Sequence, residues 1–450
     1  MSRTVIIGAG RSGLAAARYL LAQGEDVVLN DRRADPGRQM EAELAEMGLP
    51  GVWGRHPDSL FEDCGRIVLS PGVPADLPFL AAARGRGIPV LGELELAHRE
   101  LRRCDPSARI LAVTGTNGKS TTTDLAAHLL RQSGIPAAAC GNLGMPLIEA
   151  FPAAAKGTVF VVECSSYQLE TVETFHAEAA ALLNLTPDHL ARHGTMDRYL
   201  AAKQRIFLGQ GFEDLRILPG AALHLGELAP GQGSLAVFGW GQPERDGAWC
   251  DDAGRLILRQ GEALHQLLHR DELRIPGDHN VENALAAALL ASHGGAFLEG
   301  LRAGLRSYPG LAHRIASCGE KTGIRAYNDS KGTNVDATLT AIRALPGPLV
   351  LLLGGQDKGT SYRPLLLDLQ GKLRLAVFLG EAVPQLERDL GELPHRSIFP
   401  FDDAVHCALA AAQPGDQVLL SPACASFDQF ENFEARGNRF EALVKEWMSA

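Results

Sequence analysis

The sequence predicts an α/β protein of three consecutive domains, and three observations lead to this prediction. The chain has 450 residues, about three times the ~150 residues of a common domain. Short apolar runs of strand length alternate with helical stretches in three successive parts of the chain, a pattern typical of parallel sheets. The first two parts each begin with a strand that runs into a glycine-rich loop. We therefore place the domains at residues 1–104, 105–310 and 311–450.

Composition and charge exclude several classes of protein. Hydrophobic residues make up 46% of the chain and charged residues 21%, which favours a globular protein over a disordered or fibrous one. Lys and Arg total 43 against 53 Asp and Glu, so the net charge is −10 and we expect no nucleic-acid partner. The first apolar run is too short for a signal peptide, and no run approaches the ~20 residues that span a bilayer. We therefore expect a cytoplasmic protein without membrane insertion.

The eight cysteines give no sign of a disulfide scaffold or a zinc knuckle, because no two of them form a CxxC pair. We expect most of them to be buried thiols in a reducing compartment. Cys424 has no base marked near it in the sequence, so we interpret it as a buried thiol rather than a nucleophile.

The first domain is expected to hold strands and helices in alternation, the strands at residues 4–7, 26–29 and 66–69 and the helices at residues 14–23 and 93–103. Its glycine loop, residues 8–13, reads GAGRSG, and Asp31 stands at the end of the next strand. This spacing matches the fingerprint of a diphosphate-binding loop. NAD, FAD and UDP-sugars would each satisfy such a loop, and a tight turn that only packs a helix on a strand would produce the same pattern.

The second domain follows a linker at residues 105–107 and begins with a strand at residues 110–113. The loop after this strand, residues 115–121, reads GTNGKST. Backbone N–H groups of such a loop can surround phosphate oxygens, while Lys119 adds a full positive charge and Ser120 can bind Mg²⁺. A strict Walker A motif would have glycine where Val113 stands, so an ordinary turn with a surface lysine is the alternative.

Two further strands of the second domain, at residues 158–162 and 180–185, lead to polar side chains. Glu163 follows the first strand, where a Mg²⁺ ligand is needed beside a phosphate loop, although a satisfied strand-end glutamate would look the same. His189 follows the second strand and belongs to the ligand edge of the sheet, but a helix-capping or exposed histidine fits equally well. His189 and His193 have the i, i+4 spacing of a zinc pair without any further zinc signature.

The rest of the chain is a weakly patterned stretch and then a third α/β region. Residues 209–275 show no clear periodicity, and a helix is expected at residues 281–292. Strands are expected at residues 323–327, 349–353, 373–379 and 417–420. Polar clusters follow three of these strands, at residues 328–334, 354–358 and 421–426. Their hydroxyls and two lysines suit a small substrate that carries carboxylates, ordinary turn chemistry being the alternative.

Several long motifs, in one order along the chain, resemble those of the Mur ligases. These motifs are residues 115–121, 163–170, 184–189, 202–206, 279–280, 312–314 and 328–334. Residues 420–430, LSPACASFDQF, are similar to the members of the family that add glutamate to a UDP-muramoyl substrate. The resemblance implies a Rossmann-like N-terminal domain for the UDP substrate, a P-loop-type ATPase central domain and a Rossmann-like C-terminal domain for glutamate. It also implies a cytoplasmic enzyme, which we expect to be a monomer.

The activity that the resemblance implies is ATP-dependent formation of an amide bond between UDP-N-acetylmuramoyl-L-alanine and D-glutamate in peptidoglycan precursor synthesis. A carboxylate is inert toward an amine at neutral pH, so the alanyl carboxylate would first become an acyl phosphate. Negative charge gathers in this step and in the next, so the site needs fixed cations. By resemblance, two Mg²⁺ ions take part, one held by Ser120 and Glu163 and the second associated with His189.

Lys203 matches a family lysine that CO₂ converts to a carbamate. This modification replaces a cation that would repel Mg²⁺ with a carboxylate-like ligand. The local pattern alone would predict a lysine on a helix surface.

The resemblance assigns the remaining candidate residues by position. The catalytic set is Lys119, Glu163, His189 and Lys203, and the metal set is Ser120, Glu163, His189 and Lys203. The ATP set is Gly115, Thr116, Asn117, Gly118, Lys119, Ser120, Thr121, Asn280, Asn283, Arg314 and Asp329, with Arg314 arriving when the third domain closes. The UDP-substrate set is Arg11, Ser12, Asp31, Arg32, Ser70, Pro71, Gly72 and Asn142, and the glutamate set is Thr333, Lys358, Ser426 and Phe433. The chain departs from the family at Gln356-Asp357-Lys358, where Asp-Gly-Lys is frequent, and at Gly332, where alanine is frequent.

Three alternatives are weighed against this assignment. Another amide ligase on the same scaffold, such as a folylpolyglutamate synthase or a Mur ligase for a different amino acid, is disfavoured by residues 420–430 and by the first glycine loop. A nicotinamide dehydrogenase would use residues 8–13 but would leave residues 115–121 without a role. A nucleotide-gated binding protein would bind ATP without coupling its turnover to a product.

Overall fold

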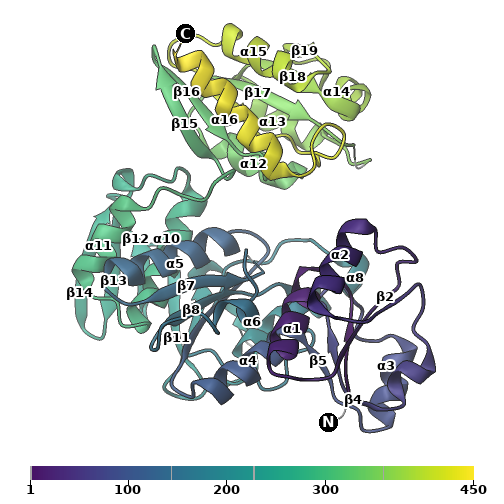
Figure 1. Ribbon diagram of the computed structural model, residues 1–450. Coiled ribbons are helices and arrows are strands. Elements are labelled where there is room, and N and C mark those ends of the chain that lie inside the picture. Colours follow the sequence, from purple (N-terminus) through teal and green to yellow (C-terminus); the bar gives the residue numbers. More distant parts are fainter. Residues whose placement is uncertain (1–2, 143, 227–228, 358, 450) are drawn as a thin grey trace. The chain divides into compact units, whose positions relative to one another are not determined.

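The computed structural model describes residues 3–142, 144–226, 229–357 and 359–449 (Figure 1). The chain divides into two compact units, one formed by residues 1–272 and 281–307 and the other by residues 273–280 and 308–450. The first unit contains a five-stranded and a nine-stranded sheet, and the second contains a six-stranded sheet, counted over the described residues. The α/β fold predicted from the sequence is confirmed, with a mainly parallel sheet in each of three successive regions.

The N-terminal sheet is parallel throughout and has the strand order β3-β2-β1-β4-β5. Its strands are β1 (Arg3–Ile7), β2 (Val27–Asp31), β3 (Gly51–Trp53), β4 (Cys64–Leu69) and β5 (Val90–Gly92), and its helices are α1 (Arg11–Ala22), α2 (Arg38–Met47), α3 (Pro78–Gly85) and α4 (Glu93–Cys104). Val5 and Ile7 of β1 pack on the α3 side, whereas Ile6 packs on the side of α1 and α4. Burial on both faces explains the continuous apolar run of β1. The strand order reverses between β1 and β4, where a ligand crevice is expected in such a sheet.

The middle sheet has the order β14-β13-β12-β11-β10-β9-β6-β8-β7, and only the pairs formed by β13 are antiparallel among its described strands. Its strands are β6 (Arg109–Thr114), β7 (Ala137–Gly141), β8 (Val159–Glu163), β9 (Ala179–Leu182), β10 (Leu215–Pro219), β11 (Ser234–Trp240), β12 (Gly247–Cys250), β13 (Arg255–Gln260) and β14 (Ala263–His269). Its helices are α5 (Lys119–Gln132), α6 (Leu147–Ala150), α7 (Ser166–Leu169), α8 (Leu190–His193), α9 (Met196–Gln204), α10 (Asp278–His293) and α11 (Leu298–Ser307).

The structure adds five strands, β10 to β14, in the weakly patterned residues 209–275. They extend the middle sheet on the side of β9. The pattern was weak because β13 and β14 alternate buried and exposed positions only in part, and because glycines and prolines interrupt the connections. The strand predicted at residues 180–185 ends earlier, at Leu182 of β9.

One continuous core joins the N-terminal sheet to the middle region. Leu20 of α1 and Leu94 of α4 belong to the same apolar cluster as Leu147 of α6. Beside this cluster, the Glu95 carboxylate accepts hydrogen bonds from the N–H groups of Glu173, at 2.9 Å, and Thr174, at 3.0 Å. The two sheets of the first unit are therefore held together both by apolar packing and by hydrogen bonds to the buried Glu95 carboxylate.

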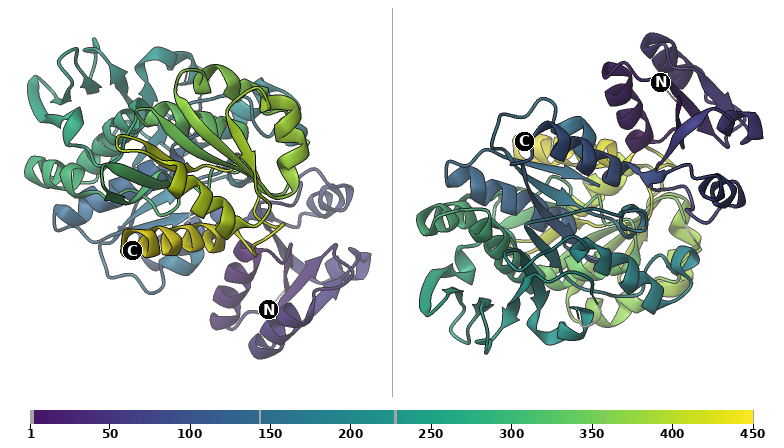
Figure 2. Two further views of the ribbon diagram at one scale, coloured as in Figure 1. Left: turned by 90° about the horizontal axis from the view of Figure 1, so that it is seen from above. Right: turned by 90° about the horizontal axis from the view of Figure 1, so that it is seen from below.

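The C-terminal sheet has the order β15-β16-β20-β17-β18-β19, and β15 is antiparallel to β16. Its strands are β15 (Ala316–Lys321), β16 (Ile324–Asn328), β17 (Leu349–Gly354), β18 (Leu373–Leu379), β19 (His395–Ser397) and β20 (Gln417–Leu420), and its helices are α12 (Val335–Ala344), α13 (Leu366–Leu369), α14 (Val383–Leu390), α15 (Phe401–Ala411) and α16 (Phe433–Ser449). Side chains of α12, α13 and α14 cover one face, and those of α15 and α16 cover the other. Figure 2 shows α16, in yellow, along its face of this sheet.

Two further observations concern the whole described chain. Within the described ranges, none of the helices combines the length and the apolar character that crossing a bilayer requires. All eight cysteines are free thiols, and most are buried, as the sequence predicts.

Candidate functional site

The carboxyl ends of three neighbouring strands bring the main candidate residues of the first unit to one edge of the middle sheet. β6 lies between β8 and β9, so the loop at residues 115–118 is flanked by Glu163 and by the segment that leads to His189. Gly118 has a φ of 83°, and a Cβ there would lie 2.3 Å from Asn283 Oδ1. Only glycine satisfies both conditions, which explains the loop sequence.

Asn184 shapes this loop, and sequence reasoning left it out of the candidate set although it begins one of the motifs. Its Oδ1 accepts the N–H of Thr116 at 3.1 Å and that of Asn117 at 2.8 Å. The Thr116 hydroxyl in turn accepts the N–H of Thr186 at 3.0 Å. The segment after β9 therefore fixes the conformation of the glycine loop.

Two lysines converge on one carbonyl oxygen of the loop. Lys119 Nζ donates to the Gly115 oxygen at 3.0 Å and to the Thr116 oxygen at 2.8 Å, and Lys203 Nζ donates to the Gly115 oxygen at 2.7 Å. Lys203 is buried, so the surface position that its local pattern suggests is wrong: α9 turns this side chain toward the loop. Burial, together with the charge of Lys119, lowers the pKa of Lys203 to about 7.

Glu163 ends β8 and is buried. Its Oε1 accepts a hydrogen bond from Asn142 Nδ2 at 2.6 Å. Among the residues that the structure describes, Glu163 Oε2 is buried without a hydrogen-bond partner. A buried acceptor of this kind calls for a cation or a donor, so the carboxylate fits a role as a metal ligand.

The two histidines after β9 have different environments. His189 is half exposed, has a φ of 54° and contacts the Tyr167 hydroxyl through Nδ1 at 3.2 Å. It makes no side-chain cap of α8, and its left-handed backbone is a strained state found often at functional positions. His193 is buried and contacts Ser166 Oγ at 3.0 Å and Glu170 Oε1 at 3.3 Å. No cluster of three His, Cys, Asp or Glu side chains suited to a metal ion occurs in the described part of the chain.

The glycine loop of the N-terminal sheet is closed by Asp31 and Ser70. Asp31 Oδ2 accepts the Ala9 N–H at 2.7 Å, and Ser70 Oγ donates to the Gly8 oxygen at 2.8 Å. Arg33, which was not predicted, donates to Asp31 through its N–H at 2.9 Å and through Nε at 3.1 Å. Burial acts to raise the pKa of Asp31, but the hydrogen bonds from Arg33 and Ala9 outweigh it and hold the pKa below its ordinary value.

The other predicted residues of the UDP-substrate set lie around this loop or on the neighbouring sheet. Arg11, Arg32, Gly72 and Asn142 are exposed, whereas Ser12 and Pro71 are partly buried. Asn142 is placed by its bond to Glu163 rather than by the N-terminal loop.

In the second unit, the candidates Asp329 and Thr333 follow β16, Ser426 follows β20, and Phe433 begins α16. Asp329 is buried and accepts a hydrogen bond from Ser421 Oγ at 2.7 Å. Burial raises its pKa to about 7, against the Ser421 bond and the positive charge of Arg314. Ser426 is buried, Thr333 and Phe433 are partly buried, and the predicted Lys358 lies outside the described residues. Cys424 is buried with its Sγ 2.9 Å from the Tyr362 hydroxyl, which agrees with a structural thiol.

The ATP set is divided between the two units. Asn283 borders the glycine loop of the first unit, where the Thr122 hydroxyl donates to its Oδ1 at 3.3 Å. Asn280 belongs to the second unit and donates to the Pro276 oxygen at 2.7 Å. Arg314 and Asp329 also belong to the second unit.

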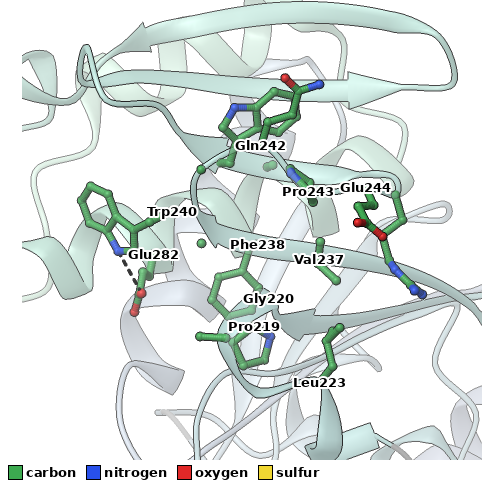
Figure 3. A pocket seen from close by; sticks show the side chains of 16 residues that line it. Pro219, Gly220, Leu223, Val237, Phe238, Trp240, Gln242, Pro243, Glu244 and Glu282 are labelled. Atoms are coloured by element: carbon green, nitrogen blue, oxygen red, sulfur yellow. Dashed lines mark hydrogen bonds between the residues drawn. The ribbon is translucent and has the colours of Figure 1, made fainter.

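A separate cavity of about 460 Å³ opens at the ends of β10, β11 and β12 (Figure 3). Its aromatic lining includes Phe238, Trp240 and Trp249, and Trp240 Nε1 donates to Glu282 Oε1 at 3.1 Å. None of the predicted site residues lines it. The candidate site is therefore defined by the glycine loops and strand ends rather than by this cavity.

Three family models match successive parts of the chain. They are the Mur ligase MurD-like N-terminal domain at residues 2–92, the Mur ligase middle domain at residues 113–291, and the Mur ligase glutamate ligase domain at residues 313–424. Among solved structures, MurC from Thermotoga maritima superposes with a TM-score of 0.59 at 18% identity, with all of both chains covered. A structure of MurF from Acinetobacter baumannii gives the same score and identity over 95% of this chain and 91% of that one. At such identities the likeness shows the fold.

Curated relatives are closer in sequence. The UDP-N-acetylmuramoylalanine--D-glutamate ligase of Acidobacterium capsulatum is 40% identical over 98% of this chain and 96% of its own. Proteins of the same name from Pelotomaculum thermopropionicum and Alkaliphilus metalliredigens are 40% and 36% identical, each over 98% of this chain and 97% of its own. Such identity over nearly the full length, together with the three domain matches, shows that the chain belongs to the Mur ligase family.

Proposed function

We propose that this Mur ligase joins D-glutamate to the alanyl carboxylate of UDP-N-acetylmuramoyl-L-alanine, with ATP as the energy source, in peptidoglycan precursor synthesis. The observation that carries the proposal is the convergence of Lys119 and Lys203 on the Gly115 carbonyl, beside a buried Glu163 carboxylate with an unpartnered oxygen in the described structure. This arrangement suits binding of a triphosphate and transfer of its terminal phosphoryl group. The substrates follow from the relatives, whose names specify them.

The reaction has two steps with different demands on the protein. In the first, the alanyl carboxylate attacks the terminal phosphorus of ATP, and the bond to the β-phosphate oxygen breaks to release ADP. In the second, the neutral amine of glutamate attacks the acyl phosphate, phosphate leaves, and the nitrogen loses a proton. Lys119 supplies positive charge where the phosphoryl oxygens gather, and the glycine loop holds the chain of phosphates in position.

The residues at the loop fit Mg²⁺ because Glu163 offers an unshared carboxylate oxygen, within the described part of the chain, and Ser120 lies buried in the first turn of α5. These two residues would hold one ion, and His189 with a modified Lys203 would hold the second. When bound, Mg²⁺ neutralises charge on the transferred phosphoryl group.

Carbamylation of Lys203 fits its environment. With a pKa of about 7, a large fraction of this amine is neutral near pH 7 and can attack CO₂. A C–N bond forms and the nitrogen of the neutral amine releases one proton, so a carbamate anion replaces an uncharged amine. That anion lies beside the ammonium group of Lys119, so the modified side chain has an ionic partner ready.

The three substrates are assigned to three regions of the chain. We assign the UDP substrate to residues 1–104, where Asp31 closes the first glycine loop, ATP to residues 105–310, and glutamate to residues 311–450. Within the last region, Thr333, Lys358, Ser426 and Phe433 are the proposed contacts. We further propose that the enzyme acts in the cytoplasm as a monomer.

The test is identification of the product by mass spectrometry. The purified protein is incubated with UDP-N-acetylmuramoyl-L-alanine, ATP and Mg²⁺, in parallel with D-glutamate, L-glutamate or diaminopimelate. We expect a product that is heavier by one glutamyl residue with D-glutamate only, and one ADP and one phosphate released per product. Formation of a product with another amino acid instead, or ATP turnover without any product, would contradict the proposal.

A further inference from the structure

Arg436 is a fully buried arginine near the start of α16, with 1% of its surface exposed. Its guanidinium makes four hydrogen bonds, to Ser330 Oγ at 2.9 Å, the Ser330 carbonyl at 2.8 Å, and the Cys424 and Ala425 carbonyls, both at 3.2 Å. Each acceptor is a carbonyl or hydroxyl oxygen, so none of the four bonds neutralises the positive charge.

These bonds join loops that follow different strands. Ser330 lies in the loop after β16, and Cys424 and Ala425 lie in the loop after β20. The loop after β17 is attached to the same point, because the Gln356 N–H donates to the Ala425 oxygen at 2.9 Å. A Cβ on Gly355 would lie 2.3 Å from that oxygen and 3.1 Å from Arg436 Nη1. The loop after β17 therefore packs so closely against the Ala425 oxygen and the guanidinium that residue 355 has no room for a side chain. One side chain thus organises all three polar strand ends of the sheet.

The loops that Arg436 joins carry the proposed glutamate contacts. Thr333 lies three residues after Ser330, and Ser426 directly follows Ala425. Ser330 links Arg436 to Phe433: its hydroxyl accepts a hydrogen bond from Arg436 and donates one to the Phe433 carbonyl at 2.9 Å. A change at the guanidinium would therefore displace Thr333, Ser426 and Phe433 together.

The charge of Arg436 also suits an acidic amino acid. Burial lowers the pKa of Arg436 to about 10, with the nearby Cys424, Asp428 and Asp329 acting in the opposite direction, so the side chain remains a cation at neutral pH. Glutamate must present a neutral amine to react, and in that form it carries two negative charges. A buried cation behind its site favours this form, because charges interact strongly where water is excluded.

We propose that Arg436 is the positioning residue of the amino-acid site: it locks the loops after β16, β17 and β20 into one surface for glutamate and sets a buried positive charge behind that surface. The inference rests on the proposed function. It predicts that loss of Arg436 raises the KM for glutamate far more than the KM for ATP or for the UDP substrate. A merely structural arginine would instead lower the stability of the whole second unit and affect all substrates that depend on it.

The experiment compares steady-state KM values for D-glutamate, ATP and the UDP substrate in the wild type and in the variants R436M, R436K and R439M. R436M removes the charge and the donors, R436K keeps the charge but loses the planar set of donors, and R439M is the matched control. Arg439 lies one turn further along α16 and forms an exposed ion pair with Asp402. Unfolding midpoints and circular dichroism show which variants are folded.

We expect R436M to raise the KM for D-glutamate by about 100-fold, the scale on which a small displacement of positioning groups acts. The KM for ATP should rise far less, through the neighbouring Asp329, and the KM for the UDP substrate should not change. R436K recovers part of this loss, and R439M behaves as the wild type. An unchanged KM for D-glutamate in folded R436M, or a parallel rise in all three KM values, overturns the proposal.

The experiment also covers two other cases: a variant that does not fold, and a wild type that makes no product with D-glutamate. If R436M does not fold, R436K and S330A are measured instead. S330A removes the hydroxyl that lies between Arg436 and Phe433. An unchanged KM for D-glutamate in both variants overturns the proposal. If the wild type makes no product with D-glutamate, the proposed function fails first. The same KM comparison with the amino acid that the wild type does accept then decides the role of Arg436.

Discussion

The two glycine-rich loops of the first unit begin alike and differ in the charge that surrounds them. The loop after β1 gives its Ala9 N–H to the Asp31 carboxylate, whereas the loop after β6 presents its Gly115 carbonyl to two ammonium groups. A carboxylate beside a loop can accept hydroxyl or N–H donors of a nucleotide, and ammonium groups attract phosphoryl oxygens. Glycine spacing therefore predicts where a loop can bind a phosphate, and the charged side chains around the loop determine which groups it can accept.

Glycine is required for a similar steric reason in both loops. A Cβ on Gly13 would lie 2.0 Å from the Gly8 oxygen, and one on Gly118 would lie 2.3 Å from Asn283 Oδ1. Gly10, by contrast, has open space around the position of a Cβ. Close approach of backbone and side chain is therefore the shared reason for glycine, and it carries no information about the ligand.

The largest effect is expected from Lys119→Ala, which takes the full charge from the second loop. We expect kcat to fall by about 1000-fold or more, because cationic groups at transferred phosphoryl oxygens contribute on that scale. Circular dichroism should be unchanged. Lys156→Ala, at an exposed position, is the control and should retain wild-type kcat. Wild-type turnover in Lys119→Ala would show that the two loops do not differ in the way described.

A second strong effect is expected from Lys203→Met, with kcat reduced by about 100-fold or more, because loss of a proposed metal ligand should cost at least as much as loss of a group that only orients one. Short carboxylates such as formate should restore part of the activity if they occupy the place of the carbamate. Indifference of the rate both to the substitution and to added carboxylate would count against this role.

Lys203→Met should also change how the free energy of unfolding depends on pH. Since the folded pKa of Lys203, about 7, lies below its ordinary value of 10.5, the unfolded state binds more protons between these two values. The free energy of unfolding of the wild type should therefore rise with pH across that window, and this contribution should be absent in Lys203→Met. Denaturant titrations at several pH values, in buffer purged of CO₂, measure the difference.

The smallest effect is expected from Asp31→Ala in the first loop. Loss of a carboxylate that accepts the Ala9 N–H and pairs with Arg33 should raise the KM for the UDP substrate by about tenfold, as for a hydrogen bond to a charged group. The KM for ATP should not change. Asp35→Ala, whose carboxylate accepts the Gly37 N–H on an exposed turn, is the control. Equal changes in both KM values would contradict the assignment of the first loop to the UDP substrate.

The fold was predictable because buried parallel strands read as continuous apolar runs, as in β6, β8 and β17. The outermost strand β14 and its neighbour β13 lacked this signal, because only some of their positions are buried. Local pattern therefore predicted the centre of each sheet better than its margins.

The candidate site was predictable where a residue stands next to a strand end, as with Lys119 and Glu163. Lys203 had no local signal, since its burial comes from the packing of α9 against a loop 88 residues away in sequence. Asn184, Arg33 and Arg436 each form a hydrogen bond with the backbone of another segment, Arg33 with the Ala9 oxygen, and such partners are set by tertiary structure. Only the resemblance to a family pointed to Lys203, and nothing in the sequence pointed to Arg436.

The continuous core between α1, α4 and α6 has a practical consequence for dissecting the chain. A cut at residue 104 would leave Leu20 and Leu94 without the partners that Leu147 and its neighbours provide. It would also strip the Glu95 carboxylate of the N–H groups of Glu173 and Thr174. The piece before the cut would then carry an uncovered apolar face with an unsatisfied acid in it, a combination that favours aggregation, so residues 1–272 and 281–307 are best treated as one inseparable folding unit.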